Sequence, residues 1–225
     1  MKNKLTIASF VLAATTSNLA VSEVKFMPPE MESVDLQSYS IGTINNQDVP
    51  KELKDMAKKQ NDELRKNGYY KADYGSLMNV DANANLPKPP PGASKQKYAL
   101  KISEPDLSLF PGAKLMFSEA MGGATKDGWT GIARIYNIPG IGNIQFEDVD
   151  YILSQGNFSL MQEFINTDIN GWPAAFSVAK ENEKKWQSEL YWGTDNKAYS
   201  LITSKKIKKG DKMYNLLLAF ARSVR

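Results

Sequence analysis

The chain has 225 residues and a formal net charge of +3, and 42% of its residues are hydrophobic. These values fit one compact domain, or one domain with an extension, and exclude collagen-like and disordered chains. The sequence contains no cysteine and no histidine, which excludes disulfide frameworks, serine–histidine hydrolases and histidine-ligated zinc enzymes. Since no glycine-rich phosphate-binding spacing is present either, we expect no cofactor and no metal site.

Residues 1–22 have the pattern of a signal peptide. Lys2 and Lys4 precede a short apolar run at Leu5–Ala14, and small and polar residues follow up to Ser22. The run is shorter than the roughly 20 residues that a membrane-spanning helix needs, and no later stretch approaches that length. We therefore expect a periplasmic or secreted protein, cleaved near Ser22, without a transmembrane segment. Loss of the two lysines leaves a net charge of +1, which does not favour nucleic-acid binding.

Residues 23–93 are predicted to form an arm that precedes the main domain. A short strand is expected at Tyr39–Ile44, and a charged helix follows at residues 48–67. Asp48 is suited to cap the start of this helix. The tyrosine-, asparagine- and proline-rich residues 69–93 are typical of a linker, so we place the domain boundary there.

Residues 94–225 are predicted to form an α+β domain. A turn at Gly122-Gly123 separates two of its strands, and a bulge near Glu147-Asp148 would reconcile two opposite alternations of apolar residues. Phe158 to Ile165 have the spacing of a short helix. The strands expected in this first part lie at residues 98–102, 114–117, 129–138 and 144–153.

The last third of the chain has the clearest pattern. Alternating apolar residues at 174–178, 186–192 and 199–203, joined by short polar turns, predict a three-stranded antiparallel meander. Asp211 then caps an amphipathic helix that continues towards Val224. We expect a two-layer α+β fold, with an antiparallel sheet covered on one face by this C-terminal helix and an N-terminal helical arm beside it.

The order of these last elements, a meander followed by an amphipathic C-terminal helix, resembles PsbP-like domains. The resemblance covers about residues 170–225. It implies a binding or accessory role, since that is what PsbP-like domains perform. It rests on the order of the elements and not on a motif, so it assigns no role to any single residue.

Glu147, Asp148 and Asp150 form the only dense acidic cluster in the predicted sheet. One interpretation is a cation site or an acid/base pair like that of a glycosidase. The other is a solvated strand end. Because neighbouring residues of a strand point to opposite faces, only Asp148 and Asp150 could converge. For the hypothesis of a carboxylate-dependent hydrolase of an envelope polysaccharide, the residues to test are Asp148, Asp150 and Asp168.

Five lysines lie between the last predicted strand and the last helix. They are suited to contact an anionic surface such as lipid headgroups or lipopolysaccharide, or they form an ordinary solvated turn. Tyr191 is a further candidate, because it is predicted to lie on the face of the sheet that the C-terminal helix leaves open. The lysines are Lys205, Lys206, Lys208, Lys209 and Lys212.

Three functions therefore stay open. The first is an exported, non-enzymatic binding or accessory protein of the bacterial cell envelope, which would bind an envelope protein or a small ligand. The second is the carboxylate-dependent hydrolase. The third is a binder of lipid or lipopolysaccharide surfaces that uses the five lysines.

Overall fold

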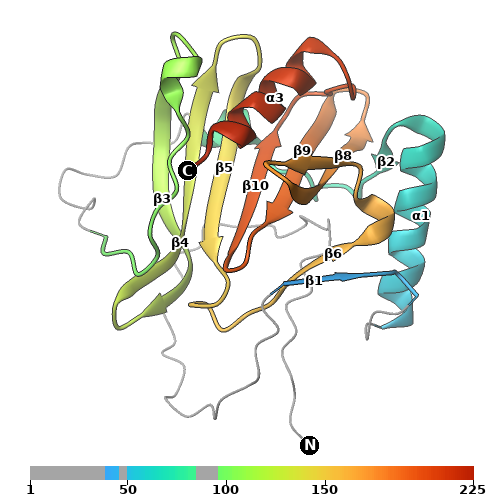
Figure 1. The fold of residues 1–225 in the computed structure, drawn as a ribbon. Helices are drawn as coiled ribbons and strands as arrows, with labels where there is room; N and C mark the ends of the chain where they lie inside the picture. Colours follow the sequence, from blue (N-terminus) through green and yellow to red (C-terminus); the bar gives the residue numbers. More distant parts are fainter. Residues whose placement is uncertain (1–38, 46–49, 85–95) are drawn as a thin grey trace, which may run out of the picture.

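The computed structural model describes residues 39–45, 50–84 and 96–225 (Figure 1). The expected signal peptide, its cleavage site and Asp48 lie outside these residues. The helices are α1 (Lys51–Asn67), α2 (Val80–Asn83) and α3 (Lys212–Ser223), and two 3₁₀ turns are η1 (Leu107–Leu109) and η2 (Gln162–Phe164). The strands are β1 (Tyr39–Gly42), β2 (Tyr70–Lys71), β3 (Lys114–Thr125), β4 (Gly128–Ile138), β5 (Gly142–Asp150), β6 (Phe158–Met161), β7 (Thr167–Ile169), β8 (Trp172–Asn182), β9 (Lys185–Gly193) and β10 (Lys197–Thr203).

An eight-stranded sheet forms the centre of the molecule. Its order is β2-β8-β9-β10-β5-β4-β3, and β7 also pairs with β8. All neighbours are antiparallel except β2 and β8. The predicted meander is present as β8, β9 and β10, but it is part of this larger sheet and does not form a sheet by itself. The free edge of β10 pairs with β5, which brings β4 and β3 into the same sheet.

Helix α3 covers one face of this sheet (Figure 1). Asp211 caps the helix as predicted, because its Oδ1 atom accepts a hydrogen bond from the Tyr214 backbone N–H at 2.7 Å. Leu217 and Phe220 are fully buried, and the Phe220 ring packs edge-on against that of Phe146 on β5. The α+β class and the amphipathic C-terminal helix are confirmed.

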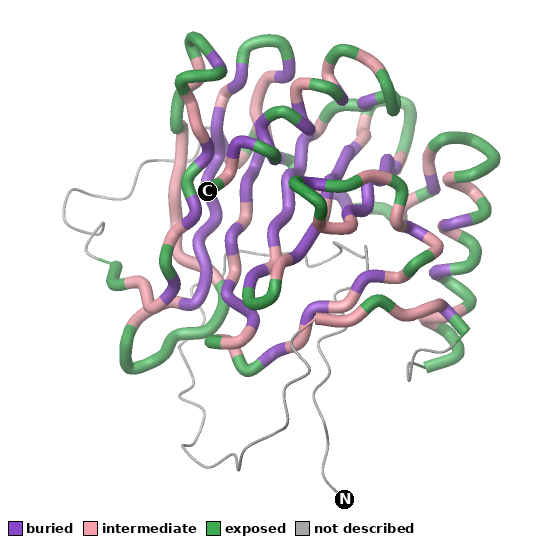
Figure 2. The backbone as a smooth tube through the Cα atoms, in the orientation of Figure 1, coloured by how far each residue is buried: buried purple, intermediate pink, exposed green. Residues whose placement is uncertain are grey.

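The opposite face of the sheet is covered as well, so the expectation of an open face is wrong. Val80 of α2 is fully buried and packs in one cluster with Ile135 and Ile202 of the sheet. Strands β1 and β6 pair with each other in parallel and pack on the same face, where Phe158 contacts Tyr191. Figure 2 shows the result, with buried backbone running through the central strands.

One predicted strand and one predicted turn in the first part of the domain need correction. Residues 98–102 form no strand, and only Tyr98 pairs, with Trp129. From Gly131 onwards β4 pairs with β3 on one edge and with β5 on the other, so it has no free edge on which residues 98–102 could form a strand. Gly122-Gly123 is not a turn: both glycines lie within β3 at a register shift, and the chain reverses at residues 126–127.

The bulge and the short helix expected further along are also absent. The pairing of β5 with β4 and β10 has no register shift, so Asp148 and Asp150 continue the buried face begun by Ile144. The alternation of apolar residues could not reveal this, because carboxylates occupy buried positions. Phe158–Met161 forms strand β6 and not a helix, since pairing with β1 decides the conformation of so short an apolar segment.

Helix α1 is the expected charged helix, and it ends where predicted. Gly68 adopts a left-handed conformation (φ 75°), and its N–H donates to the Leu64 carbonyl at 2.8 Å. Tyr70 then pairs with Ala179 of β8, so part of the expected linker belongs to the sheet. The division into an arm and a domain stays a prediction.

Among the described residues, no helix combines the length and apolar character needed to cross a bilayer.

Candidate functional site

Asp148, the first of the predicted acidic residues, is fully buried and serves as an anchor. Its Oδ2 atom accepts a hydrogen bond from the Ser103 backbone N–H at 2.6 Å. The Lys197 ammonium lies 3.2 Å from both of its carboxylate oxygens. The same ammonium also donates to the Lys101 carbonyl. These contacts hold the segment before η1 against the sheet and leave Asp148 inaccessible to a substrate.

Asp150 and Asp168 are engaged in other local contacts. The Asp150 carboxylate accepts hydrogen bonds from the Leu153 backbone N–H at 2.8 Å and from Asn196 Nδ2 at 3.1 Å, which closes two turns. Asp168 is exposed and lies 3.9 Å from Arg222. Because β8, β9 and β10 lie between β7 and β5, the strand of Asp168 is about 19 Å across the sheet from the strand of the other two acids. That separation is too large for a glycosidase pair.

Ser103 and Lys197 form a pair that the sequence did not reveal. Ser103 Oγ lies 2.7 Å from Lys197 Nζ and 3.0 Å from the Tyr199 hydroxyl. A serine next to a lysine is a known catalytic arrangement. Here both residues are buried, and the ammonium is already paired with Asp148. The pair therefore closes the fold and offers no nucleophile to a substrate.

All five predicted lysines are exposed, on what we call the basic loop (residues 204–212). The backbone beneath them is firmly held. Ser188 Oγ donates to the Lys205 carbonyl at 2.8 Å and accepts from the Ile207 N–H at 2.9 Å, while Ile207 itself is buried. The Lys208 N–H donates to Asp211 Oδ2 at 3.1 Å. A fixed backbone thus presents these lysines at the surface, where the Lys209 ammonium donates a hydrogen bond to the Asn166 carbonyl at 2.5 Å.

An aromatic pair adjoins the basic loop. The Trp186 and Tyr69 rings meet edge-on with centroids 5.1 Å apart. The Lys206 ammonium lies 4.2 Å from the Trp186 centroid, and the Lys180 ammonium lies 5.1 Å from it. These cation–π contacts position two positive charges beside each other. Glu183 balances one of them, through its ion pair with Lys180.

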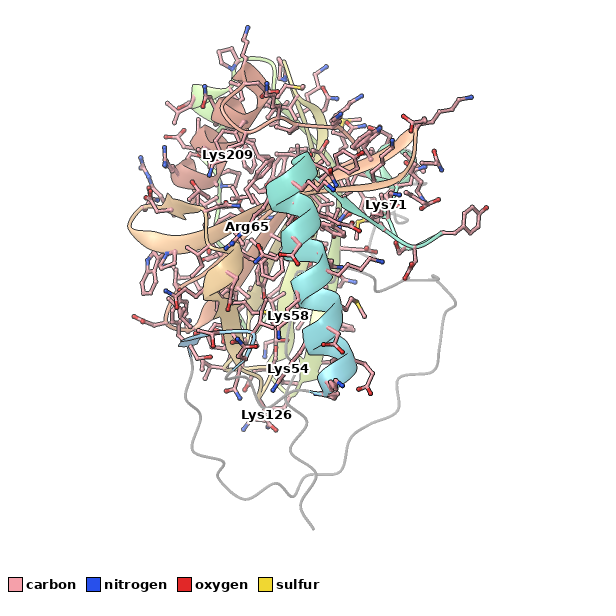
Figure 3. The ribbon with its side chains drawn as sticks, turned by 90° about the vertical axis from the view of Figure 1, so that its right-hand side faces the viewer. Lys54, Lys58, Arg65, Lys71, Lys126 and Lys209 are labelled. Carbon is pink, nitrogen blue, oxygen red and sulfur yellow. The ribbon has the colours of Figure 1, made fainter. Side chains whose placement is uncertain are left out.

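Further basic residues lie on the neighbouring face of the molecule. Figure 3 views this face, with α1 towards the reader, and shows Lys54, Lys58 and Arg65 along the helix and Lys209 to the left of its upper end. The first three recur at helical spacing, so they share one stripe of α1. Acidic residues of α1 lie between them and other lysines, which makes the charge of the helix surface more mixed than that of the basic loop.

Tyr191 does not line an open binding surface. It is half-buried, and its ring centroid lies 5.0 Å from that of Phe158 on β6. Gln187 and Glu189, its neighbours on the same face of β9, are buried. Tyr191 is therefore part of the packing between the sheet and the β1–β6 pair.

A buried carboxyl group on this face escaped the sequence analysis. Glu189 is only 6% exposed, and its Oε2 atom has no hydrogen-bond partner among the described residues. Burial, reinforced by the charge of Glu147, raises the pKa of Glu189 to about 8, while Gln187 opposes the shift. The sequence offered one signal for this residue, a glutamate between a polar and an apolar residue of a predicted strand, and that pattern also fits an exposed face.

The described residues contain no group of acidic side chains suited to hold a metal ion.

Comparison with known proteins found no matching family model and no matching curated protein. A solved structure from Bacteroides thetaiotaomicron is similar to this chain at 15% identity and a TM-score of 0.29. The match covers 50% of this chain and 41% of that chain, so less than half of the other protein is spanned. A similarity of this size carries no argument about function, which has to be inferred from the residues of the chain itself.

Proposed function

We propose that the chain is an exported, non-catalytic binding protein whose basic loop contacts an anionic partner in the cell envelope. The proposal of export rests on the sequence of residues 1–22. The proposal of binding rests on the basic loop. Its five lysines form the densest positive charge of the sequence, and none of them is used in an ion pair among the described residues.

The observation that carries the proposal is the combination of a held backbone with exposed charges. Ser188 and Asp211 satisfy the backbone of the basic loop from below, so the loop does not have to be ordered when a partner binds. Pre-organised charges lose less conformational entropy on binding than charges on an unstructured loop. Lysine is also a suitable residue for contacts with phosphate groups and carboxylates, as a compact point charge.

The acidic residues support a non-catalytic role. Asp148 is buried in an ion pair, Asp150 closes turns and Asp168 lies apart from both. A glycosidase needs two carboxyl groups about 5 to 10 Å apart across an accessible substrate site. The described residues of the chain do not offer such a pair at these three positions.

A binding assay with paired charge variants tests the proposal. One variant replaces Lys205, Lys206, Lys208 and Lys209 by glutamate. The control variant makes the same charge change on α1, at Lys51, Lys58, Lys59 and Lys66, which are also exposed. Both are compared with the full chain on phosphatidylglycerol vesicles, on purified lipopolysaccharide and in a cross-linked pull-down from an envelope fraction.

The basic-loop variant is expected to lose at least tenfold in affinity for one of these probes, whereas the control variant keeps most of its affinity. Binding by the unchanged chain should also weaken as salt rises from 0.05 to 0.5 M, because exposed charges are screened over about 10 Å at 0.1 M. Equal losses in both variants, or binding that does not respond to salt, would refute the proposal.

A further inference from the structure

Glu189 stands out as an acidic group that is buried without a positively charged partner among the described residues. It lies in the middle of β9, opposite Ser177 on one side and Ile202 on the other. Its side chain is 94% buried, and one carboxylate oxygen lacks a hydrogen-bond partner among the described residues. A buried carboxylate without a partner is costly, so the group is stable at this site only in its protonated form.

The charged and titratable groups around Glu189 offer no positive partner. From β5 it faces Glu147, and from β2 it faces the phenol of Tyr70, whose pKa is raised by burial and further by Glu189. Burial raises the pKa of Glu119 on β3, and the nearby charge of Glu147 raises it further. No ion pair of Glu189 occurs among the described residues.

Residues 70–84, which we call the cover segment, begin with the edge strand β2 and continue over this part of the sheet. Figure 1 shows the chain after β2 passing behind the sheet, on the face opposite α3. The Met78 N–H donates to Gln187 Oε1 at 2.9 Å, and the Val80 N–H donates to Ser204 Oγ at 3.0 Å. Val80 also packs on Ile202, the residue directly opposite Glu189.

The charged residues of the cover segment do not neutralise Glu189. Lys71 and Asp73 are exposed, and the carboxylate of Asp81 accepts a hydrogen bond from Asn143 Nδ2 at 3.0 Å. Contact between the segment and the sheet around Glu189 therefore depends on apolar packing and on a few hydrogen bonds.

We propose that Glu189 makes docking of the cover segment pH-dependent: the segment stays on the sheet while this carboxyl group holds its proton, and it lifts off when the carboxylate forms and takes up water. The sheet face that is then exposed carries Glu147, Gln187 and Ser200 beside Glu189. The proposal does not rest on the lysines of the basic loop or on the proposed binding function, although Ser204, at the start of that loop, holds the Val80 N–H.

The direction of the effect follows from proton linkage. Burial in the docked state, reinforced by the charge of Glu147, raises the pKa of Glu189 to about 8 from 4.5, and exposure to water on undocking lowers it towards its ordinary value. The docked state thus binds a proton that the undocked state releases between these values. The docking constant falls by up to tenfold for each pH unit in this interval, and it levels off above about pH 8.

Hydrogen–deuterium exchange of the full chain tests this device. Peptides that span residues 70–84 are followed from pH 5.5 to 9, with each rate corrected for the intrinsic exchange rate at that pH, and peptides from α3 serve as an internal standard. The protection of the cover segment should fall by roughly tenfold per pH unit up to about pH 8, while α3 keeps its protection. In the Glu189→Gln variant the protection of residues 70–84 should not change with pH.

A matched control is Glu183→Gln, which removes an exposed glutamate from the β8–β9 turn and should keep the pH dependence of the unchanged chain. A carbon-13 NMR titration of the Glu189 carboxyl group gives a second measurement that needs no variant. The proposal would be overturned by pH-independent protection in the unchanged chain, by an equal slope in Glu189→Gln, or by an ordinary titration of Glu189 near pH 4.5.

Discussion

The ammonium of Lys197 lies 3.2 Å from both carboxylate oxygens of Asp148, and neither side chain is more than 10% exposed. The pair joins β10 to β5 and holds Ser103 through a hydrogen bond to each residue. Removing one partner leaves an uncompensated charge in a site that excludes water. The pair is therefore important for stability, whether or not it makes a net contribution compared with apolar residues.

Lys197→Met should lower the free energy of unfolding by about 3 to 5 kcal/mol, because it leaves Asp148 charged and buried. Urea unfolding followed by circular dichroism measures the change. Asp148→Asn combined with Lys197→Met should cost less than the sum of the two single variants, since the two residues are in contact. Lys101→Met, at an exposed position in the segment that the pair anchors, is the control and should stay within about 0.5 kcal/mol of the unchanged chain. If the double variant costs as much as the sum of the two single variants, Asp148 and Lys197 do not stabilise the fold as a pair.

Asp211→Ala should lower stability by about 1 kcal/mol, because it removes the N-cap of α3. It should also loosen the basic loop, since Asp211 accepts the Lys208 N–H. Hydrogen exchange of the Lys208 amide should then become faster, whereas Asp195→Ala, at an exposed turn, should change neither quantity. An unchanged Lys208 exchange rate would mean that the cap does not hold the loop.

Gly193→Ala should lower stability by about 1 to 3 kcal/mol through overpacking. A Cβ atom at residue 193 would lie 2.5 Å from the Phe158 ring, which belongs to β6 and packs on the sheet. Gly156→Ala is the control, since its Cβ would meet its nearest atom at an ordinary 3.5 Å. Thermal unfolding compares the two variants. A combination with Phe158→Leu should reduce the cost of Gly193→Ala if the ring is the cause.

Glu189→Gln should change how stability depends on pH. The raised pKa of about 8 means that the folded chain retains a proton which the unfolded chain releases above pH 4.5. The contribution of Glu189 to the stability of the unchanged chain therefore falls as pH rises from about 4.5 to 8. The amide introduced by Glu189→Gln cannot ionise, so the variant should match the unchanged chain near pH 4.5 and exceed it by a few kcal/mol at pH 8.5. Parallel stability curves would contradict this account.

The sequence by itself determined the local features of this protein. Alternation in β8, β9 and β10 predicted three strands whose registers place Ala174 opposite Trp192, and Trp192 opposite Tyr199. Asp211 marked the start of the last helix and the charged pattern marked the end of α1 at Asn67, because such signals depend only on neighbouring residues. The exposure of the five lysines in the basic loop followed from their density, since so many adjacent charges cannot be buried together.

The tertiary structure alone decided what covers the sheet and which polar residues are buried. The carboxyl groups of Asp148 and Glu189 both lie in predicted strands, yet one is paired with Lys197 and the other keeps one oxygen without a hydrogen-bond partner among the described residues. The difference comes from residues far away in the chain, from Ser103 on one face and the cover segment on the other. Such long-range contacts are invisible to periodicity, which reports only that a strand has two faces and not what each face meets.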